Sequence, residues 1–106
     1  MPESQPIFPV LDRVIHEPAR LAILTVLSAC DGADFTFLQN ATGLSKGNLS
    51  VQLTRLEEAG LISINKVLFR KTTRTSASLS KQGKQQLNDY WLTMKQIHEK
   101  GANPAG

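Results

Sequence analysis

Cysteine is almost absent from this 106-residue chain, which contains a single thiol, Cys30. One cysteine cannot form an intramolecular disulfide, and it cannot supply the several thiolates that a structural zinc site requires. Because Cys30 closes an apolar segment, we expect it to be buried and inert and not a redox sensor. The lack of a disulfide framework also leads us to expect a cytoplasmic protein.

Long apolar runs are missing as well. No stretch of about 18 uncharged apolar residues occurs, so we expect no membrane-spanning helix and no membrane partner. The N-terminal sequence MPESQPIFPV has neither a basic start nor a long apolar region, which argues against a secretory signal. The two histidines, His16 and His98, lack a second ligand at metal spacing, and we therefore expect no metal site.

Catalytic motifs are a third absence. The chain has no nucleophile with a nearby histidine base, no phosphate-binding glycine loop and no carboxylate pair flanked by other polar functional residues. We therefore expect neither an enzyme nor a cofactor. The length is that of one domain, and an apolar content of 41% is enough for one core.

Positive charge is present and is concentrated in one part of the chain. Residues 1–44 carry a net charge of −3, residues 45–84 carry +6 and residues 85–106 are neutral, which gives +3 in total. A contiguous basic stretch is typical of proteins that bind a polyanion. A solvated basic surface would have the same composition, so charge alone does not decide between the two.

The periodicity of apolar residues predicts a single domain at 10–99, between flexible segments at 1–9 and 100–106. We expect helices at 10–16, 18–30, 34–42, 46–59 and 81–99, and strands at 61–67 and 73–79 with a hairpin tip at 68–72. The segment 34–42 could also start with a brief extended stretch. A short helix, a tight glycine turn and a second helix form a helix-turn-helix, and a hairpin directly after it would be a wing. The predicted fold class is mainly α with a small antiparallel β-hairpin, a winged helix-turn-helix.

The helix at 46–59 combines one apolar face with a polar remainder. At about 100° per residue, Leu49, Leu53 and Leu56 fall together and should face the core. The cap and the outward or flanking positions of this helix are Ser45, Lys46, Asn48, Ser50, Val51, Gln52 and Arg55. Arg and Lys can donate to guanine, Asn and Gln can pair with adenine, and a small apolar group can contact the thymine methyl. These residue types suit the DNA major groove, and Gly47 would let the helix start approach DNA closely, although an ordinary solvated face is also polar.

The predicted hairpin has a basic tip. Its cations are Lys66, Arg70, Lys71 and Arg74, which fall within nine residues. A basic tip beside a recognition helix can lie along the phosphate backbone or enter a minor groove. Charges at a tip can also keep an edge strand soluble. The neighbouring basic helix favours the DNA interpretation.

Three sequence motifs carry a resemblance over about residues 10–95. They are LDRVIHEPARLAIL, TFLQNATGLSKGNLSVQLTRLEEAGLI and, after the basic hairpin, LSKQGKQQL. Together they resemble winged helix-turn-helix regulators of the MarR/ArsR-like kind, most closely a short single-domain family. The resemblance implies a DNA-binding transcriptional regulator, usually a homodimer, with its recognition helix at 45–59 and its wing at 66–75. It implies DNA contacts at Ser45, Lys46, Asn48, Ser50, Gln52, Arg55, Arg70, Lys71 and Arg74. The clustered metal ligands of ArsR-like sensors have no counterpart in this sequence.

The two ends of the domain carry more apolar surface than a compact core needs. The first segment contains Val10, Leu11, Val14 and Ile15, and the last helix contains Tyr90, Trp91, Met94 and Ile97. Both stripes could pack within one domain. We favour a homodimer seam, which would hold two recognition helices about 34–36 Å apart, on successive major grooves.

The combined prediction is a homodimeric, sequence-specific protein that binds double-stranded DNA and represses transcription. The alternative is a winged helix that serves as a protein-interaction module without DNA binding, because fold alone does not fix function. A small-molecule effector is compatible with the first prediction, but no sequence motif indicates one.

Overall fold

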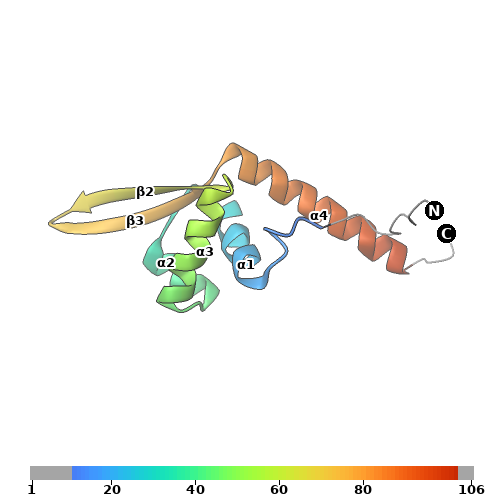
Figure 1. The fold of residues 1–106 in the computed structure, drawn as a ribbon, viewed down its shortest axis with the longest axis horizontal. Coiled ribbons are helices and arrows are strands. Elements are labelled where there is room, and N and C mark those ends of the chain that lie inside the picture. Colours follow the sequence, from blue (N-terminus) through green and yellow to red (C-terminus); the bar gives the residue numbers. More distant parts are fainter. Residues whose placement is uncertain (1–10, 103–106) are drawn as a thin grey trace, which may run out of the picture.

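The computed structural model describes residues 11–102. The molecule is elongated, with extents of 62 × 29 × 24 Å. A body of short helices lies in the middle, a long hairpin projects from one end and the last helix projects from the other (Figure 1). The elements in chain order are α1 (Pro18–Ser28), β1 (Ala33–Asp34), α2 (Phe35–Thr42), α3 (Lys46–Glu58), β2 (Ile62–Phe69), β3 (Thr72–Leu79) and α4 (Lys81–Ala102).

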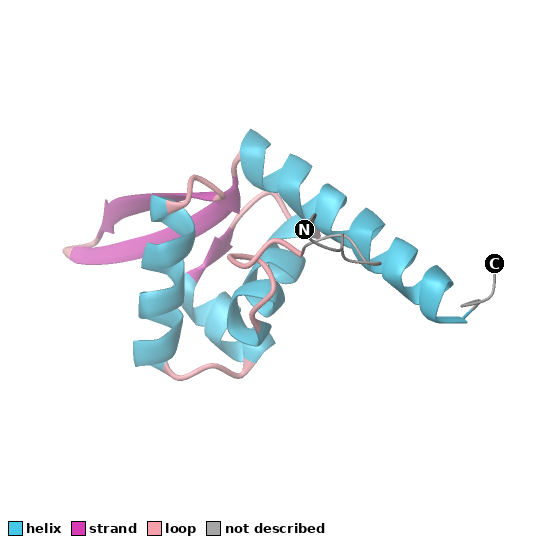
Figure 2. Cartoon of the chain, turned by 45° about the vertical axis from the view of Figure 1, so that its right-hand side comes forward, coloured by secondary structure: helices cyan, strands magenta, loops and turns pink. Residues whose placement is uncertain are grey.

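The strands form one antiparallel sheet in the order β1-β3-β2. β2 and β3 pair along their whole length, from Ile62 opposite Leu79 to the pair next to the turn. β1 adds two residues to the other edge of β3, with Ala33 opposite Ala77. The extended start that the sequence allowed before α2 is therefore confirmed, and it ties the helix-turn-helix to the base of the hairpin (Figure 2).

The core lies where the three short helices meet the base of the sheet. Its fully buried side chains are Ile15, Ile23, Leu24, Leu27, Leu38, Leu49, Leu56 and Leu61. The predicted core face of α3 is confirmed, because Leu53 is buried together with Leu49 and Leu56. Burial of these side chains fixes which face of α3 remains outside.

α4 begins in close contact with the chain that leads into β2. The Ser80 hydroxyl accepts a hydrogen bond from the Gly83 N–H at 2.9 Å and donates one to the Gly60 carbonyl at 2.6 Å. A Cβ on Gly83 would lie 1.9 Å from the Leu61 carbonyl oxygen. The glycine of the LSKQGKQQL motif is thus required by packing.

Three predictions about the chain are wrong. Residues 13–15 form a turn and not a helix. The Asp12 carboxylate caps this turn, but Glu17 precedes Pro18 and is extended, so the turn does not continue into a helix. α1 ends at Ser28, so Cys30 lies beyond the helix and is exposed. α4 continues to Ala102, into the segment expected to be a flexible tail.

Val10 and the segments 1–9 and 103–106 lie outside the described residues. Across residues 11–102, no helix has both the length and the apolar character needed to cross a membrane.

Candidate nucleic-acid interface

α2 and α3 form the helix-turn-helix. α2 ends at Gly43, whose φ of 73° is left-handed and whose N–H donates to the Gln39 carbonyl at 2.9 Å. α3 begins after Ser45, whose hydroxyl accepts from the Asn48 N–H at 3.1 Å. The predicted turn and cap are therefore confirmed. The first residues of α3 are exposed, so the N–H groups at its start lie at the molecular surface.

The half of α3 that faces away from the core carries most of the predicted DNA contacts. The exposed residues are Ser45, Lys46, Asn48, Ser50, Val51 and Arg55. Val51 is 49% exposed although its side chain is apolar. The helix thus presents cations, an amide, hydroxyl groups and one small apolar group to solvent, the set that base edges can bind.

Gln52 differs from its neighbours because it is half-buried and bonded at both ends of its amide. Its Oε1 accepts from Nη1 of Arg20 at 2.9 Å, and its Nε2 donates to Oδ1 of Asn48 at 3.0 Å. A chain of hydrogen bonds therefore runs from α1 to the surface of α3. Arg20 was not among the predicted site residues, because nothing in the sequence links it to a residue 32 positions further along.

Glu17 holds Arg20 from the other side. Its carboxylate accepts from the Arg20 N–H at 2.8 Å and lies 3.9 Å from the Arg20 guanidinium. Partial burial alone would raise the pKa of Glu17, but hydrogen bonds from the N–H groups of Arg20 and Ala19, and the charges of Arg20 and Arg55, outweigh it and lower that pKa. Glu17 is therefore ionised at neutral pH and can keep the Arg20 guanidinium in place.

The wing, which consists of β2, β3 and their turn, reverses direction through two cations. Arg70 and Lys71 connect the strands with φ angles of 49° and 65°. Two successive left-handed residues are typical of a type I′ turn, in which Asn and Gly are the favoured residues. The predicted tip at 68–72 is too long, since Leu68, Phe69 and Thr72 belong to the strands. The backbone of the hairpin is therefore strained at Arg70 and Lys71, the two cations of its turn.

The wing cations lie on different faces of the hairpin. Lys66 shares a face with Ile64, which packs against the core, because alternate residues of a strand point the same way. Arg74 lies on the opposite face, where its guanidinium stacks on the Phe69 ring at 4.7 Å; that of Arg70 stacks on the same ring at 5.4 Å. Lys66 therefore faces the side on which α3 lies, and Arg74 faces away from it.

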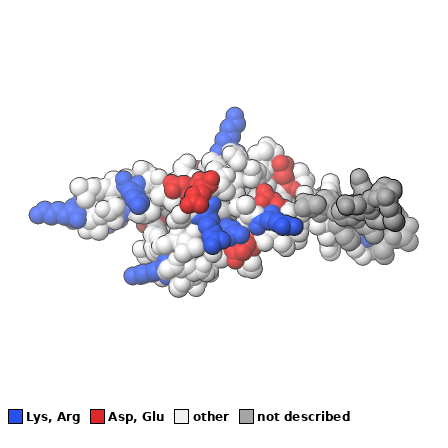
Figure 3. All heavy atoms as spheres, viewed as in Figure 1, with Lys and Arg blue, Asp and Glu red and all other residues white. Residues whose placement is uncertain are grey.

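α3 and the base of the wing enclose a hollow of about 190 Å³. Ser50 and Thr54 line it from the helix, and Lys66 and Thr75 line it from the strands. Figure 3 shows Lys and Arg side chains along the projecting hairpin and at the lower edge of the body, and side chains of both charges over the middle of this view. One predicted contact of the helix, Ser50, and one of the wing, Lys66, thus meet at a concave junction.

The outer half of the wing also exposes apolar side chains, although the sequence predicted a half-buried strand. Val67, Leu68 and Phe69 are 50%, 73% and 47% exposed. Each strand has eight residues, and the core covers only the inner part. Leu68 lies on the same face as Lys66 and could be inserted between base steps. Three consecutive apolar residues beside a charged turn are the signal that could have identified it.

Two residues assigned to a dimer seam belong to the core of one chain. Ile15 is fully buried and Tyr90 is 3% exposed. The Tyr90 hydroxyl also shares a 2.9 Å hydrogen bond with Nδ1 of His16. Their assignment to the seam is corrected, because neither side chain has surface left to offer a partner.

The other terminal apolar residues keep some exposed surface. Val14 and Trp91 are 36% and 46% exposed, and Leu92, which was not among the predicted seam residues, is 52% exposed. Leu11, Met94 and Ile97 are partly buried. These residues remain available for contact with a second chain.

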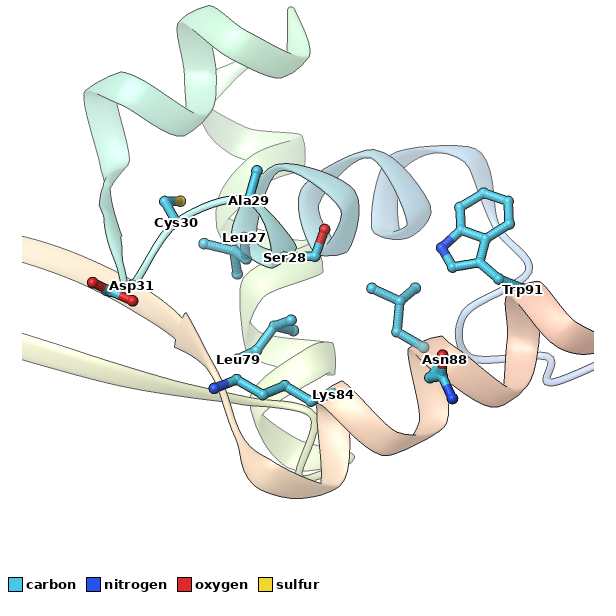
Figure 4. Close-up of a pocket in the computed structure, with 10 residues that line it drawn as sticks. Leu27, Ser28, Ala29, Cys30, Asp31, Leu79, Lys84, Asn88 and Trp91 are labelled. Carbon is cyan, nitrogen blue, oxygen red and sulfur yellow. The ribbon is translucent and has the colours of Figure 1, made fainter.

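A groove of about 410 Å³ lies between the end of α1 and α4 (Figure 4). Leu27, Leu79 and Leu87 give it an apolar lining, and Figure 4 shows Trp91 at one end and Asp31 with Cys30 at the other. Its volume is sufficient for a small ligand, and no sequence motif marks it. In the described part of the chain, no three His, Cys, Asp or Glu side chains gather as metal ligands would.

Comparisons with known proteins agree with this geometry. A family model described as a winged helix DNA-binding domain matches residues 19–98. An uncharacterized protein of Methanocaldococcus jannaschii is 24% identical over 85 residues, which cover 80% of this chain and 92% of the relative.

Several solved structures share the fold. A transcriptional regulator homologue from Pyrococcus horikoshii OT3 has a TM-score of 0.78 at 25% identity, covering 86% of this chain and 89% of that one. The transcriptional repressor CouR, solved bound to a 23-mer DNA duplex, has a TM-score of 0.71 at 22% identity, with 89% of this chain and 66% of CouR covered. A MarR family regulator from Silicibacter pomeroyi has a TM-score of 0.65 at 21% identity, with coverage of 89% and 62%. The chain therefore belongs to the family of winged helix DNA-binding domains, a non-enzymatic class, and has the fold of MarR-like transcriptional regulators.

Proposed function

We propose that this protein is a homodimeric, cytoplasmic repressor that recognises a specific sequence in double-stranded DNA. One observation carries the proposal: Ser50, on the exposed face of α3, and Lys66 of the wing line one hollow between the helix and the wing. A helix start surrounded by donors suits a phosphate, and the polar face beyond it suits base edges.

Each part of the surface has a distinct role in this proposal. Lys46 and the N–H groups at the start of α3 hold a phosphate, which fixes the register of the helix in the major groove. Asn48, Ser50, Val51 and Arg55 meet base edges and supply specificity. Lys66, Arg70, Lys71 and Arg74 follow the phosphate backbone. Arg70 and Arg74 can donate from the edges of their guanidinium groups while they stack on the Phe69 ring. Bound in this way, the protein would block transcription by occupying its site, and the repressor CouR lends support because it shares the fold.

The homodimer rests on the apolar surface of α4. The second half of this helix projects from the body (Figure 1), and Met94 and Ile97 lie on it. A two-fold pair of such helices would cover these residues and present two copies of α3 to one duplex.

The decisive experiment is fluorescence anisotropy of a labelled mixed-sequence 30-base-pair duplex, titrated at low and at moderate salt. We expect binding that weakens steeply with salt, because each phosphate contact releases counterions. Selection from a random duplex pool should then enrich one motif with two-fold symmetry. Absence of binding at low salt would contradict the proposal and favour a protein-interaction module.

A further inference from the structure

Arg20 lies on α1, outside the helix-turn-helix, yet it contacts Gln52 of α3, one of the predicted DNA contacts. Its side chain is 13% exposed, which is unusual for an arginine. Nε donates to the Val14 carbonyl and Nη1 to Oε1 of Gln52, and Glu17 lies 3.9 Å from Nη1. The guanidinium could not turn toward DNA without giving up these partners. Arg20 is therefore placed to orient its neighbour and not to bind a phosphate.

The contact fixes which way the Gln52 amide faces. Arginine has donors and no acceptor, so only the amide oxygen of Gln52 can face Arg20. The amide nitrogen then points outward and donates one hydrogen to Oδ1 of Asn48 at 3.0 Å. Because Oδ1 of Asn48 faces Gln52, the side-chain amide nitrogen of Asn48 faces outward. The unpaired groups that this chain presents to solvent are N–H donors.

Donors at this position favour bases with acceptors. In the major groove guanine offers two acceptors, N7 and O6, adenine and thymine offer one each, N7 and O4, and cytosine offers an N–H donor. Without Arg20, both amides could rotate and present oxygen or nitrogen, and the preference would be lost.

We propose that Arg20 is a specificity-determining positioning residue, which holds Gln52 and Asn48 so that α3 reads an acceptor edge, preferentially that of guanine. The inference rests on the proposed DNA-binding function and concerns the same surface. Arg20 should therefore affect which base sequence is preferred and not the affinity for DNA in general.

The test is motif selection from a random duplex pool, followed by anisotropy titrations of the selected duplex and its single-base variants. In Arg20→Met, which keeps the apolar stem, we expect preference to fall about tenfold at one or two base pairs, the value of one lost base contact. Gln52→Ala should affect the same base pairs, and the double variant should lose no more than Gln52→Ala alone. The slope of log K against log salt should stay at the wild-type value. Arg13→Met, an exposed arginine that loses the same charge, should keep the wild-type motif.

Gln52→Glu tests the inference without disturbing Arg20. A carboxylate still accepts from the guanidinium but has no N–H, so the selected base should change from guanine to cytosine, whose amino group donates. An unchanged motif in both Arg20→Met and Gln52→Glu overturns the inference. A salt slope reduced by about one in Arg20→Met also overturns it, because Arg20 would then be a direct phosphate contact. If the wild type selects no motif, the proposed function itself fails.

Discussion

Gly47, at the start of α3, is a residue at which a substitution can change DNA binding without changing the stability of the fold. A Cβ added there would meet nothing within 4 Å in the free protein. We expect Gly47→Ala to fold as stably as the wild type but to bind DNA about tenfold more weakly. The added methyl group would keep the start of α3 away from a phosphate, and the lost affinity corresponds to about one charged hydrogen bond. Anisotropy titration measures the loss. Gly101→Ala, at an equally open position in α4, should bind like the wild type. Equal affinity for both variants would mean that the α3 start stays clear of DNA.

Gly83 presents the opposite situation. Its added Cβ would lie 1.9 Å from the Leu61 carbonyl oxygen, a backbone atom that cannot move aside without shifting the chain before β2. We expect Gly83→Ala to lower the free energy of unfolding by about 1–3 kcal/mol or more, as overpacking does. Urea unfolding followed by circular dichroism gives the value. A loss below about 0.5 kcal/mol would show that α4 can move away from this contact at little cost.

At the scale of elements, the turn sequence of the wing suits binding better than folding. Replacing Arg70→Asn together with Lys71→Gly installs the residues that a type I′ turn favours and should stabilise the protein by about 1 kcal/mol. The same change should weaken binding to every duplex and reduce the salt slope by about two, one unit for each lost phosphate contact.

Anisotropy over a range of salt concentrations and urea unfolding measure the two effects of the wing variant. Lys81→Gln with Lys95→Gln removes the same charge from α4 and serves as the control. Its salt slope should change less. An unchanged slope in the wing variant would place the wing tip away from phosphate.

Elements with local signals were predictable from the sequence. Ser45 and Gly43 set the bounds of α3 and its turn, because a cap and a left-handed residue act over a few positions. Residues 13–15 were predicted wrongly, since their apolar pattern favours a helix but the extended Glu17 before Pro18 limits the segment to one turn. Likewise, the bond between Arg20 and Gln52 and the two faces of the wing depend on tertiary packing and strand register, which periodicity does not specify.

At the scale of the whole molecule, one row of apolar side chains runs along α4, and it begins against the body and continues toward the projecting end of the helix. Tyr90 is buried in the body and Met94 packs partly against the core, while Ile97 continues the stripe toward the projecting end. On the proposed dimer, Ile97→Glu should sediment as a monomer of 11.6 kDa, whereas the wild type should sediment at twice that mass. Gln96→Glu adds the same charge one residue away, on a different helical face, and should leave the dimer intact. A monomeric wild type would contradict the seam.

The projecting form of α4 has a consequence for the length of the DNA site. With 22 residues at about 1.5 Å each, the helix spans roughly 33 Å. In a dimer that pairs through the projecting halves of its two α4 helices, the number of residues between the body of each chain and the dimer seam would set the separation and the relative rotation of the two copies of α3. One inserted residue would turn each body by about 100° and misalign it with the groove. Seven would restore the facing side and lengthen each of the two α4 helices by about 10 Å, the length of three base pairs. Proteins of this fold that differ only in the length of this helix should therefore recognise half-sites with different gaps.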